Sequence, residues 1–191
     1  MALDSNSTVV VNPDNIPWVS AIAAFNAAFK IVLRGNQTNG LLTIVEDLIY
    51  NAAQSRCQIH TREDEVIQVL NGSLQFYLNG YQFCAPAGTS VYIPRNATQS
   101  QRTLGTKPIH VQILFVPSGL ENYLDQILPV IAESTINQTQ ANIVAVANGL
   151  IFLPEVTWQN LNCAFDDGNL FSLSSPLTFL IVLLYVFISF C

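Results

Sequence analysis

The side chains best suited to chemistry in this 191-residue chain are an imidazole and a carboxylate, His60 and Glu65, which stand five positions apart. Neutral imidazole and carboxylate bind divalent metal ions, and they also hydrogen-bond to each other in buried polar clusters. Because side chains alternate between the two faces of a strand, Gln58 lies on the same face as His60 if this region is extended. These three residues therefore predict a polar group inside a β structure.

Short strands separated by turns should position this group. Asn71-Gly72 and Asn79-Gly80 indicate hairpins, since both central residues of such a turn need positive φ. Apolar or alternating runs predict strands at residues 9–11, 31–35, 41–50, 65–70, 73–78, 81–84, 90–94 and 109–116. Many short strands with turns at intervals of about 8–12 residues are typical of a β sandwich or barrel.

Helices are expected only after the last strand. Ser118 and Glu121 have the spacing of a capping box, in which two side chains bond reciprocally to backbone amides. Apolar residues then recur at helical spacing, at Leu120, Tyr123, Leu124, Ile127 and Ile131. A second helix is expected over residues 138–148, ending at Gly149. The apolar stripe of the first helix should pack on the barrel.

The spacing of His60, Glu65 and Gly72 resembles the first motif of the cupin superfamily, in which a His-x-His pair, a Glu and a Gly lie on two antiparallel strands. Gln58 stands in place of the first His of that pair. The resemblance implies a mostly β fold, the cupin double-stranded β-helix or jelly-roll barrel. It also implies that one or two C-terminal helices pack on this barrel.

The second cupin motif is matched only in its first part. Gly88 and Pro94 have its spacing, whereas the later positions hold other residues than the Gly, His and Asn of the motif, namely Asn96, Gln99 and Thr103. The wider pattern is similar to the small single-domain cupins often labelled quercetin-dioxygenase-like. That group has an Asn-Pro-Asp near the start, a Glu-Asp-Glu before the central strand and a Pro-x-Gly-hydrophobic-Glu helix start, which this chain matches at residues 12–14, 63–65 and 117–121.

The resemblance covers about residues 9–154 and sets the expected organisation of the chain. A single cupin domain is expected over residues 9–158, with a core barrel at about 31–117 and helices at about 118–150. The remaining residues are expected to form a short leader, a polar spacer and a hydrophobic tail, at 1–8, 159–176 and 177–191.

By family position, the metal ligands of this barrel would be Gln58, His60, Glu65 and Gln99. Glutamine oxygen is an uncharged, weak ligand, so the resemblance implies no cofactor or a weakly bound divalent metal, either Mn, Fe, Ni or Zn. The same side chains could instead form a hydrogen-bonded network that binds a small polar molecule, such as a sugar, an organic acid or a hydroxylated aromatic. His110 is a further ligand if its strand face points inward.

Two functions follow from these alternatives. The first is a cupin-domain protein with a decayed metal site, working as a surface-displayed small-molecule-binding or structural module. The second is a metal-dependent cupin enzyme, a dioxygenase or isomerase acting on a small oxygenated compound, in which Glu65 would anchor the ion. The sequence holds no Gly-x-Ser-x-Gly elbow, phosphate loop or dinucleotide fingerprint, and no catalytic residue is assigned.

The composition of the chain limits the kinds of partner that it is expected to bind. Charged residues make up 10% of the chain, the net charge is −6, and the seven Lys and Arg residues are scattered, so no nucleic-acid partner is expected. Cys57 and Cys84 flank the first motif, and they either form a disulfide in an exported protein or remain two buried thiols. A homodimer is compatible with the fold.

The hydrophobic tail predicts membrane attachment. Its 15 residues are fewer than the roughly 20 of a membrane span, and they fit the removable tail of a glycolipid (GPI) anchor signal. Asp166 and Asn162 are candidate attachment residues before the polar spacer. Residues 1–6 do not form the signal peptide that such a protein needs, so the true start is expected upstream. The alternative is an intracellular protein anchored in a membrane by its tail.

Glycosylation sequons favour the cell surface or extracellular location. Five Asn-x-Ser/Thr sequons are present, against about two expected from composition. They are Asn6 in the leader and the glycosylation candidates Asn36, Asn71, Asn96 and Asn137 in the domain.

Overall fold

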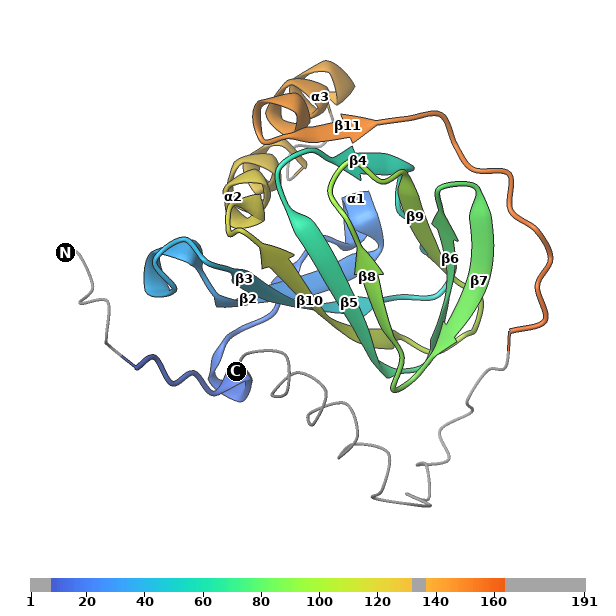
Figure 1. Ribbon diagram of the computed structural model, residues 1–191, viewed down its shortest axis with the longest axis horizontal. Coiled ribbons are helices and arrows are strands. Elements are labelled where there is room, and N and C mark those ends of the chain that lie inside the picture. The colour runs from blue at the N-terminus through green and yellow to red at the C-terminus, as the bar shows by residue number, and fades with distance from the viewer. Residues whose placement is uncertain (1–7, 132–136, 164–191) are drawn as a thin grey trace, which may run out of the picture.

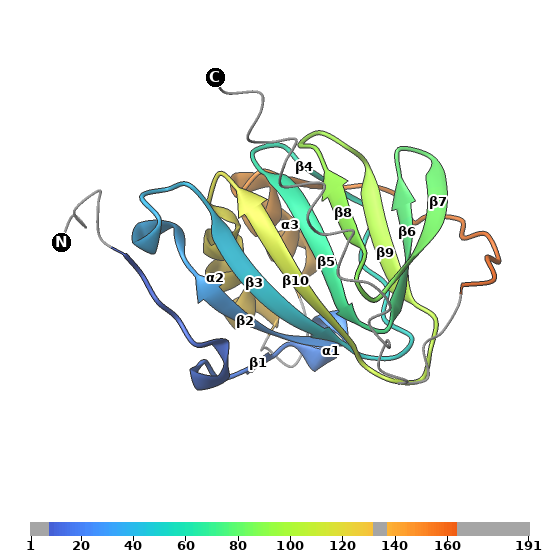
Figure 2. The same cartoon turned by 60° about the horizontal axis from the view of Figure 1, so that its bottom comes forward.

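Alternating apolar and polar residues build two antiparallel sheets around a shared core (Figures 1 and 2). A computed structural model describes residues 8–131 and 137–163. The first sheet has six strands in the order β1, β2, β3, β10, β5 and β8, with bounds Val19–Ser20, Ala27–Leu33, Thr43–Ile49, Ile109–Val116, Asp64–Asn71 and Ser90–Ile93. The second has five in the order β11, β4, β9, β6 and β7, with bounds Leu150–Phe152, Gln58–His60, Gln99–Thr103, Ser73–Leu78 and Tyr81–Pro86.

The core lies where alternate side chains of the two sheets meet. Ile67 of β5 pairs with Ile113 of β10 in the first sheet, and both side chains are buried. Leu74 and Phe76 of β6 face them from the second sheet and are fully buried. Because side chains alternate strictly along a strand, a shift of one residue would turn these groups outward, which fixes the register.

Helices cover one end of the barrel. The three helices are α1, α2 and α3, with bounds Ile22–Phe25, Leu120–Ile131 and Gln138–Ala147. Two short 3-10 turns, η1 and η2, span Pro13–Asn15 and Gly35–Gln37. α2 packs on α3, and α3 packs on β11 (Figure 1). The apolar stripe predicted for the first helix is buried in the core through Leu120, Tyr123 and Ile127, so both predicted helices are confirmed.

The predicted capping box at the start of α2 is wrong. The Glu121 carboxylate accepts hydrogen bonds from the backbone amides of Gly35 (2.8 Å) and Gly119 (2.9 Å) and from the hydroxyl of Thr43. It therefore ties the helix to β3 and η2 instead of pairing with Ser118. Burial alone would raise the pKa of Glu121, but these hydrogen bonds outweigh burial and lower it. Gly35 permits this approach, because a Cβ there would overlap the Ser118 side chain.

The strand predictions are wrong at the edges of the sheets. Residues 9–11 form no regular element, and β2 begins at Ala27 instead of residue 31. The nearby N-terminal segment instead lies on the outer face of the first sheet, where Lys30 donates a hydrogen bond to the Pro13 carbonyl (2.9 Å). β9 and β11 carry no alternating apolar pattern and were not predicted.

After β11, residues 153–163 cross the outer face of the second sheet as an extended segment, which we call the C-terminal strap (orange in Figure 1). The carbonyl of Gln159 accepts hydrogen bonds from the side chains of Gln75 (3.0 Å) and Arg102 (3.2 Å). The guanidinium of Arg102 also lies 4.8 Å from the centre of the Trp158 ring. These contacts explain how polar side chains of β6 and β9 are satisfied beneath the strap.

The strap ends in a disulfide between Cys84 and Cys163, whose Cα atoms are 5.5 Å apart. Cys57 is buried and free, so the predicted Cys57–Cys84 pairing is wrong. Strand order gives the reason: Cys57 precedes β4 and Cys84 lies on β7, with β9 and β6 between them. Three strand spacings amount to about 14 Å, twice the Cα separation that a disulfide tolerates.

The structure describes some of the predicted surface features, and others lie outside the described residues. The side chains of the glycosylation candidates are all exposed, at Asn36, Asn71, Asn96 and Asn137. Among the described residues, no helix has the length and apolar character needed to cross a membrane. The predicted hydrophobic tail and Asp166 lie outside the described residues.

Candidate functional site

The fold brings Gln58, His60, Glu65 and Gln99 together inside the barrel. Gln58 and His60 lie on β4, and Gln58 is opposite Gln99 of β9 in the ladder. Glu65 comes from β5 in the other sheet, where it pairs with Phe115 of β10. His60, Glu65 and Gln99 are at most 4% exposed, whereas Gln58 is half-buried. We call these four side chains the polar quartet.

Amide groups bond to both ionisable members of the polar quartet. The Gln99 amide nitrogen donates a short hydrogen bond to Glu65 Oε2, and the Gln58 amide nitrogen is 3.2 Å from His60 Nε2. His60 Nε2 and Glu65 Oε2 are 3.9 Å apart, and the imidazole stacks on Phe115 with ring centres 5.7 Å apart. His60 Nδ1 and Gln99 Oε1 are buried without a hydrogen-bond partner among the described residues.

Burial shifts the pKa of each ionisable group of the polar quartet toward its uncharged form. It lowers the pKa of His60 to about 4, so the imidazole is neutral over most of the physiological range. It raises the pKa of Glu65 to about 7, although the hydrogen bond from Gln99 opposes this shift. A neutral imidazole and a carboxyl that titrates near pH 7 are compatible with binding a polar ligand and with exchanging a proton with it.

As arranged, the polar quartet does not fit a transition metal. A metal would bind the lone pairs of His60 Nε2 and Glu65 Oε2, but the amide nitrogens of Gln58 and Gln99 lie against these two atoms. The amide nitrogen of Gln99 faces Glu65 Oε2, which suits the ionised form of Glu65, since a carboxylate only accepts hydrogen bonds. Within residues 8–131 and 137–163, no group of three or more His, Cys, Asp or Glu side chains has an arrangement that could hold a metal.

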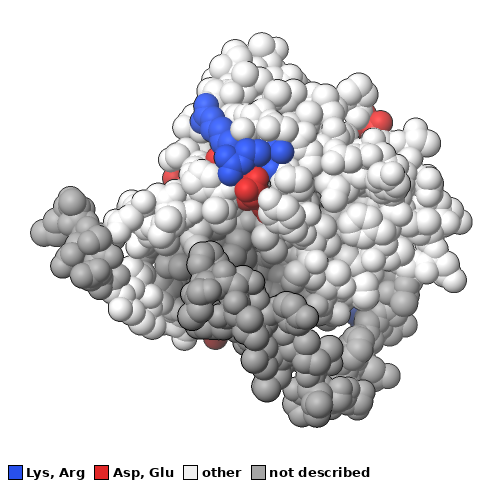
Figure 3. Space-filling view, viewed as in Figure 1, with Lys and Arg blue, Asp and Glu red and all other residues white. Residues whose placement is uncertain are grey.

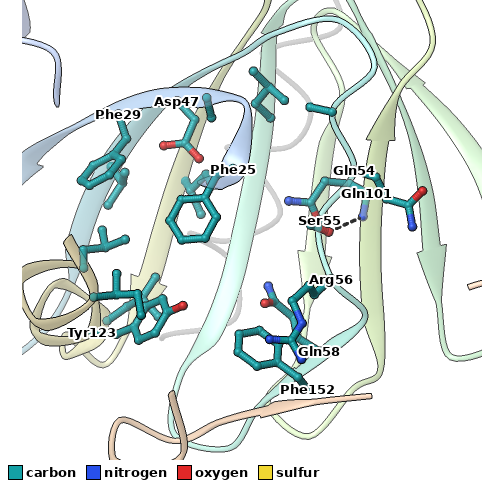
Figure 4. A pocket seen from close by; sticks show the side chains of 18 of the residues that line it. Phe25, Phe29, Asp47, Gln54, Ser55, Arg56, Gln58, Gln101, Tyr123 and Phe152 are labelled. Atoms are coloured by element: carbon teal, nitrogen blue, oxygen red, sulfur yellow. Dashed lines mark hydrogen bonds between the residues drawn. The ribbon is translucent and has the colours of Figure 1, made fainter. Parts of the chain in front are cut away.

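A cavity of about 270 Å³ lies between the barrel interior and the helices (Figure 4). Its wall is mostly apolar and includes several aromatic rings, at Phe25, Phe29, Phe115, Tyr123 and Phe152. Of the four predicted pocket residues, only Gln58 belongs to this wall. The remaining three lie deeper in the barrel, so the cavity differs from the small polar pocket that the sequence suggests.

Sequence reasoning missed Asp47, which lines the cavity from β3. In the ladders it lies opposite Phe29 and Val111, and no described residue donates a hydrogen bond to its carboxyl. Burial, with a smaller effect of the nearby Glu65, raises the pKa of Asp47 to about 7. The signal was readable, since alternation along β3 places Asp47 on the same face as Val45.

His110 does not join the polar quartet. Its neighbours Ile109 and Val111 point into the core, so alternation turns the imidazole to the outer face of the sheet. There its Nε2 is 3.1 Å from Glu46 Oε2, and its ring meets the edge of Trp18. The condition under which His110 would replace a lost ligand, an inward-facing side chain, is therefore not met.

Comparisons with known proteins agree with this architecture. No protein-family model matches the sequence, and no curated protein sequence matches it. The structure is similar to KdgF from Halomonas sp., with a TM-score of 0.52, 19% identity and coverage of 58% of this chain and 94% of that one. It is similar to the polyketide cyclase RemF from Streptomyces resistomycificus, with a TM-score of 0.51, 15% identity and coverage of 59% and 81%.

A third similar structure is an RmlC-like cupin from Shewanella frigidimarina, with a TM-score of 0.50, 15% identity and coverage of 60% of this chain and 96% of that one. At such low identity these likenesses establish the architecture and leave activity open. Together with the two antiparallel sheets, they show that this chain has the cupin fold, a mostly β jelly-roll barrel with helices packed against it.

Proposed function

We propose that this chain is a small-molecule-binding module built on a cupin barrel whose family metal site has decayed. The observation that carries the proposal is the direction of the two amides, which place N–H donors where a metal would take lone pairs from His60 and Glu65. An N–H donor and a cation satisfy the same lone pair, so the amides replace the metal as partners of these atoms. The polar quartet then rigidifies the barrel beneath the cavity.

The cavity supports a binding role. Ligand sites are typically concave and mostly apolar, with a few polar groups that orient the ligand. The cavity combines aromatic walls with polar side chains, among them Asp47 and Gln58. It is closed on one side by Tyr123 of α2 and lies beside the polar quartet, so a ligand would contact both the barrel and the helices.

Metal content tests the decayed site. We expect the full chain, expressed with iron, manganese, nickel and zinc supplied, to contain far less than one metal ion per chain by elemental analysis. His60→Ala should leave this content unchanged, because no metal is held there. His110→Ala is the matched control, since it removes the outward-facing imidazole instead.

Near-stoichiometric metal that disappears in His60→Ala and persists in His110→Ala would contradict the proposal. It would favour the alternative, a metal-dependent cupin enzyme acting on a small oxygenated compound.

We further propose that the module is displayed outside the cell on a glycolipid anchor. The Cys84–Cys163 disulfide supports an oxidising compartment, and the four glycosylation candidates are exposed. The face drawn in Figure 3 carries a small patch of basic side chains beside acidic ones, with a few other charged side chains scattered over the rest.

The disulfide distinguishes between the two candidate residues for attachment of the glycolipid anchor. Attachment at Asn162 would cut Cys163 from the mature chain, so we expect the anchor on Asp166. In cells that attach glycolipid anchors, and with a signal peptide fused before Met1, Asp166→Gln should abolish release of the protein by a phosphatidylinositol-specific phospholipase, whereas the matched Asn162→Gln should leave it intact. Loss of release in Asn162→Gln alone would contradict the assignment, and resistance of the unmodified chain would reject the glycolipid anchor.

A further inference from the structure

The carboxyl of Asp47 lines the cavity and receives no hydrogen bond from any described residue. It sits on the inner face of the first sheet, and Figure 4 shows it near the rings of Phe25 and Phe29 in that view. Phe29 is its partner in the β2–β3 ladder. Asp47 is half-buried, so water in the cavity can reach its carboxyl. A ligand that displaces this water must itself supply a hydrogen-bond donor, because an unpaired carboxyl in an apolar space is costly.

The positive groups that line the cavity are engaged elsewhere. The Arg56 guanidinium lies 3.8 Å from the centre of the Phe152 ring and bonds to Asn142 (3.2 Å). Arg102 bonds to Gln75 at 2.8 Å and stacks on the strap. Neither guanidinium bonds to Asp47. The charge of the ionised carboxylate is therefore left for a ligand to compensate.

These surroundings discriminate between ligand classes. An organic acid would be repelled by Asp47 and by the neighbouring Glu65 once these are ionised. A neutral sugar could bond to the glutamine side chains that line the cavity, but it would leave the charge of the ionised Asp47 uncompensated. An organic ammonium ion is attracted by the carboxylate and by the faces of aromatic rings, and its apolar body suits the remaining wall. A primary ammonium also supplies the N–H donors that Asp47 lacks, which a quaternary ammonium does not.

We propose that the cavity binds a primary amine with an apolar or aromatic body, its ammonium group bonded to Asp47 beside Phe29. This inference rests on the proposed binding function and names its ligand class. The amine enters with its ammonium toward β3, and its body lies along Phe115 and Tyr123.

Three probes of similar size and different charge test the inference. They are 2-phenylethylamine, 2-phenylethanol and 3-phenylpropanoate, titrated calorimetrically into the full chain at pH 8. Because charge-assisted hydrogen bonds are stronger than neutral ones, the amine should bind at least about tenfold more tightly than the alcohol, and the acid should bind weakest. Asp47→Asn should remove this tenfold preference while alcohol binding persists, which also shows that the variant is folded. Asp14→Asn is the matched control on an exposed carboxylate.

Equal affinity for the amine and the alcohol, or an amine preference that survives in Asp47→Asn, would overturn the amine inference and leave the binding function standing. Tightest binding of the acid would overturn it in favour of an anion site. Failure of all three probes to bind the unmodified chain would overturn both the inference and the proposed binding function.

Discussion

Removal of the Cys84–Cys163 disulfide is expected to lower the free energy of unfolding by about 4 kcal/mol. The bond joins residues separated by 79 positions, so it reduces the number of conformations that nearly half of the unfolded chain can adopt. In the chain-entropy account, the stabilisation grows with the logarithm of the loop length, which makes a long loop of this kind among the more effective ones. The effect should exceed that of any single contact of the strap.

The measurement is urea unfolding of the Cys84→Ala, Cys163→Ala double variant against the unmodified chain. Reduction with dithiothreitol provides the control: it should reproduce the loss in the unmodified chain and change nothing in the double variant. Cys57 is free and buried, so it should stay unreactive in the folded protein. A loss below about 1 kcal/mol would show that the unfolded state retains the strap near β7 without the bond.

Local features of the fold could be predicted where one short segment contains all the information. The β6–β7 hairpin is an example, since Asn79 and Gly80 both adopt positive φ and place Leu78 opposite Tyr81. The apolar stripe of α2 is another. β9 could not be found in this way, because its Gln-Ser-Gln-Arg-Thr sequence is polar and becomes a strand only through partners that lie far away in the chain.

The same distinction applies to the site, where some features could be predicted from the sequence and others could not. The resemblance of the motif to known cupins identified which four side chains meet, since their positions follow from the barrel. It did not provide the direction of each amide, which depends on the charge of the group opposite. The disulfide likewise depends on strand order, and no spacing of cysteines along the chain reveals that Cys84 lies beside the strap.

Glu65→Gln is expected to stabilise the barrel above neutral pH. The folded pKa of about 7 exceeds the ordinary value of 4.5, so the folded state binds the proton more tightly than the unfolded chain. The stabilisation from this group is therefore complete below about pH 4.5 and is lost as the pH rises through 7, on the order of 3 kcal/mol in total. Gln removes this loss, and its carbonyl can still accept the hydrogen bond from Gln99.

Unfolding of Glu65→Gln and of the unmodified chain should be measured between pH 4.5 and 8, because the difference between them develops between the unfolded and the folded pKa of Glu65. His60, whose pKa is lowered from 6.5 to about 4, titrates in both proteins, so its contribution largely cancels from this difference. Asp47 titrates in the same direction, so Asp47→Asn should likewise reduce the fall of stability with rising pH. Glu155→Gln, on the exposed strap, is the control. If Glu65→Gln were instead less stable at every pH, the carboxylate would have to be held ionised in the folded protein. A bound metal ion would hold the carboxylate ionised. The same experiment therefore distinguishes a barrel with a decayed metal site from a metal-dependent enzyme.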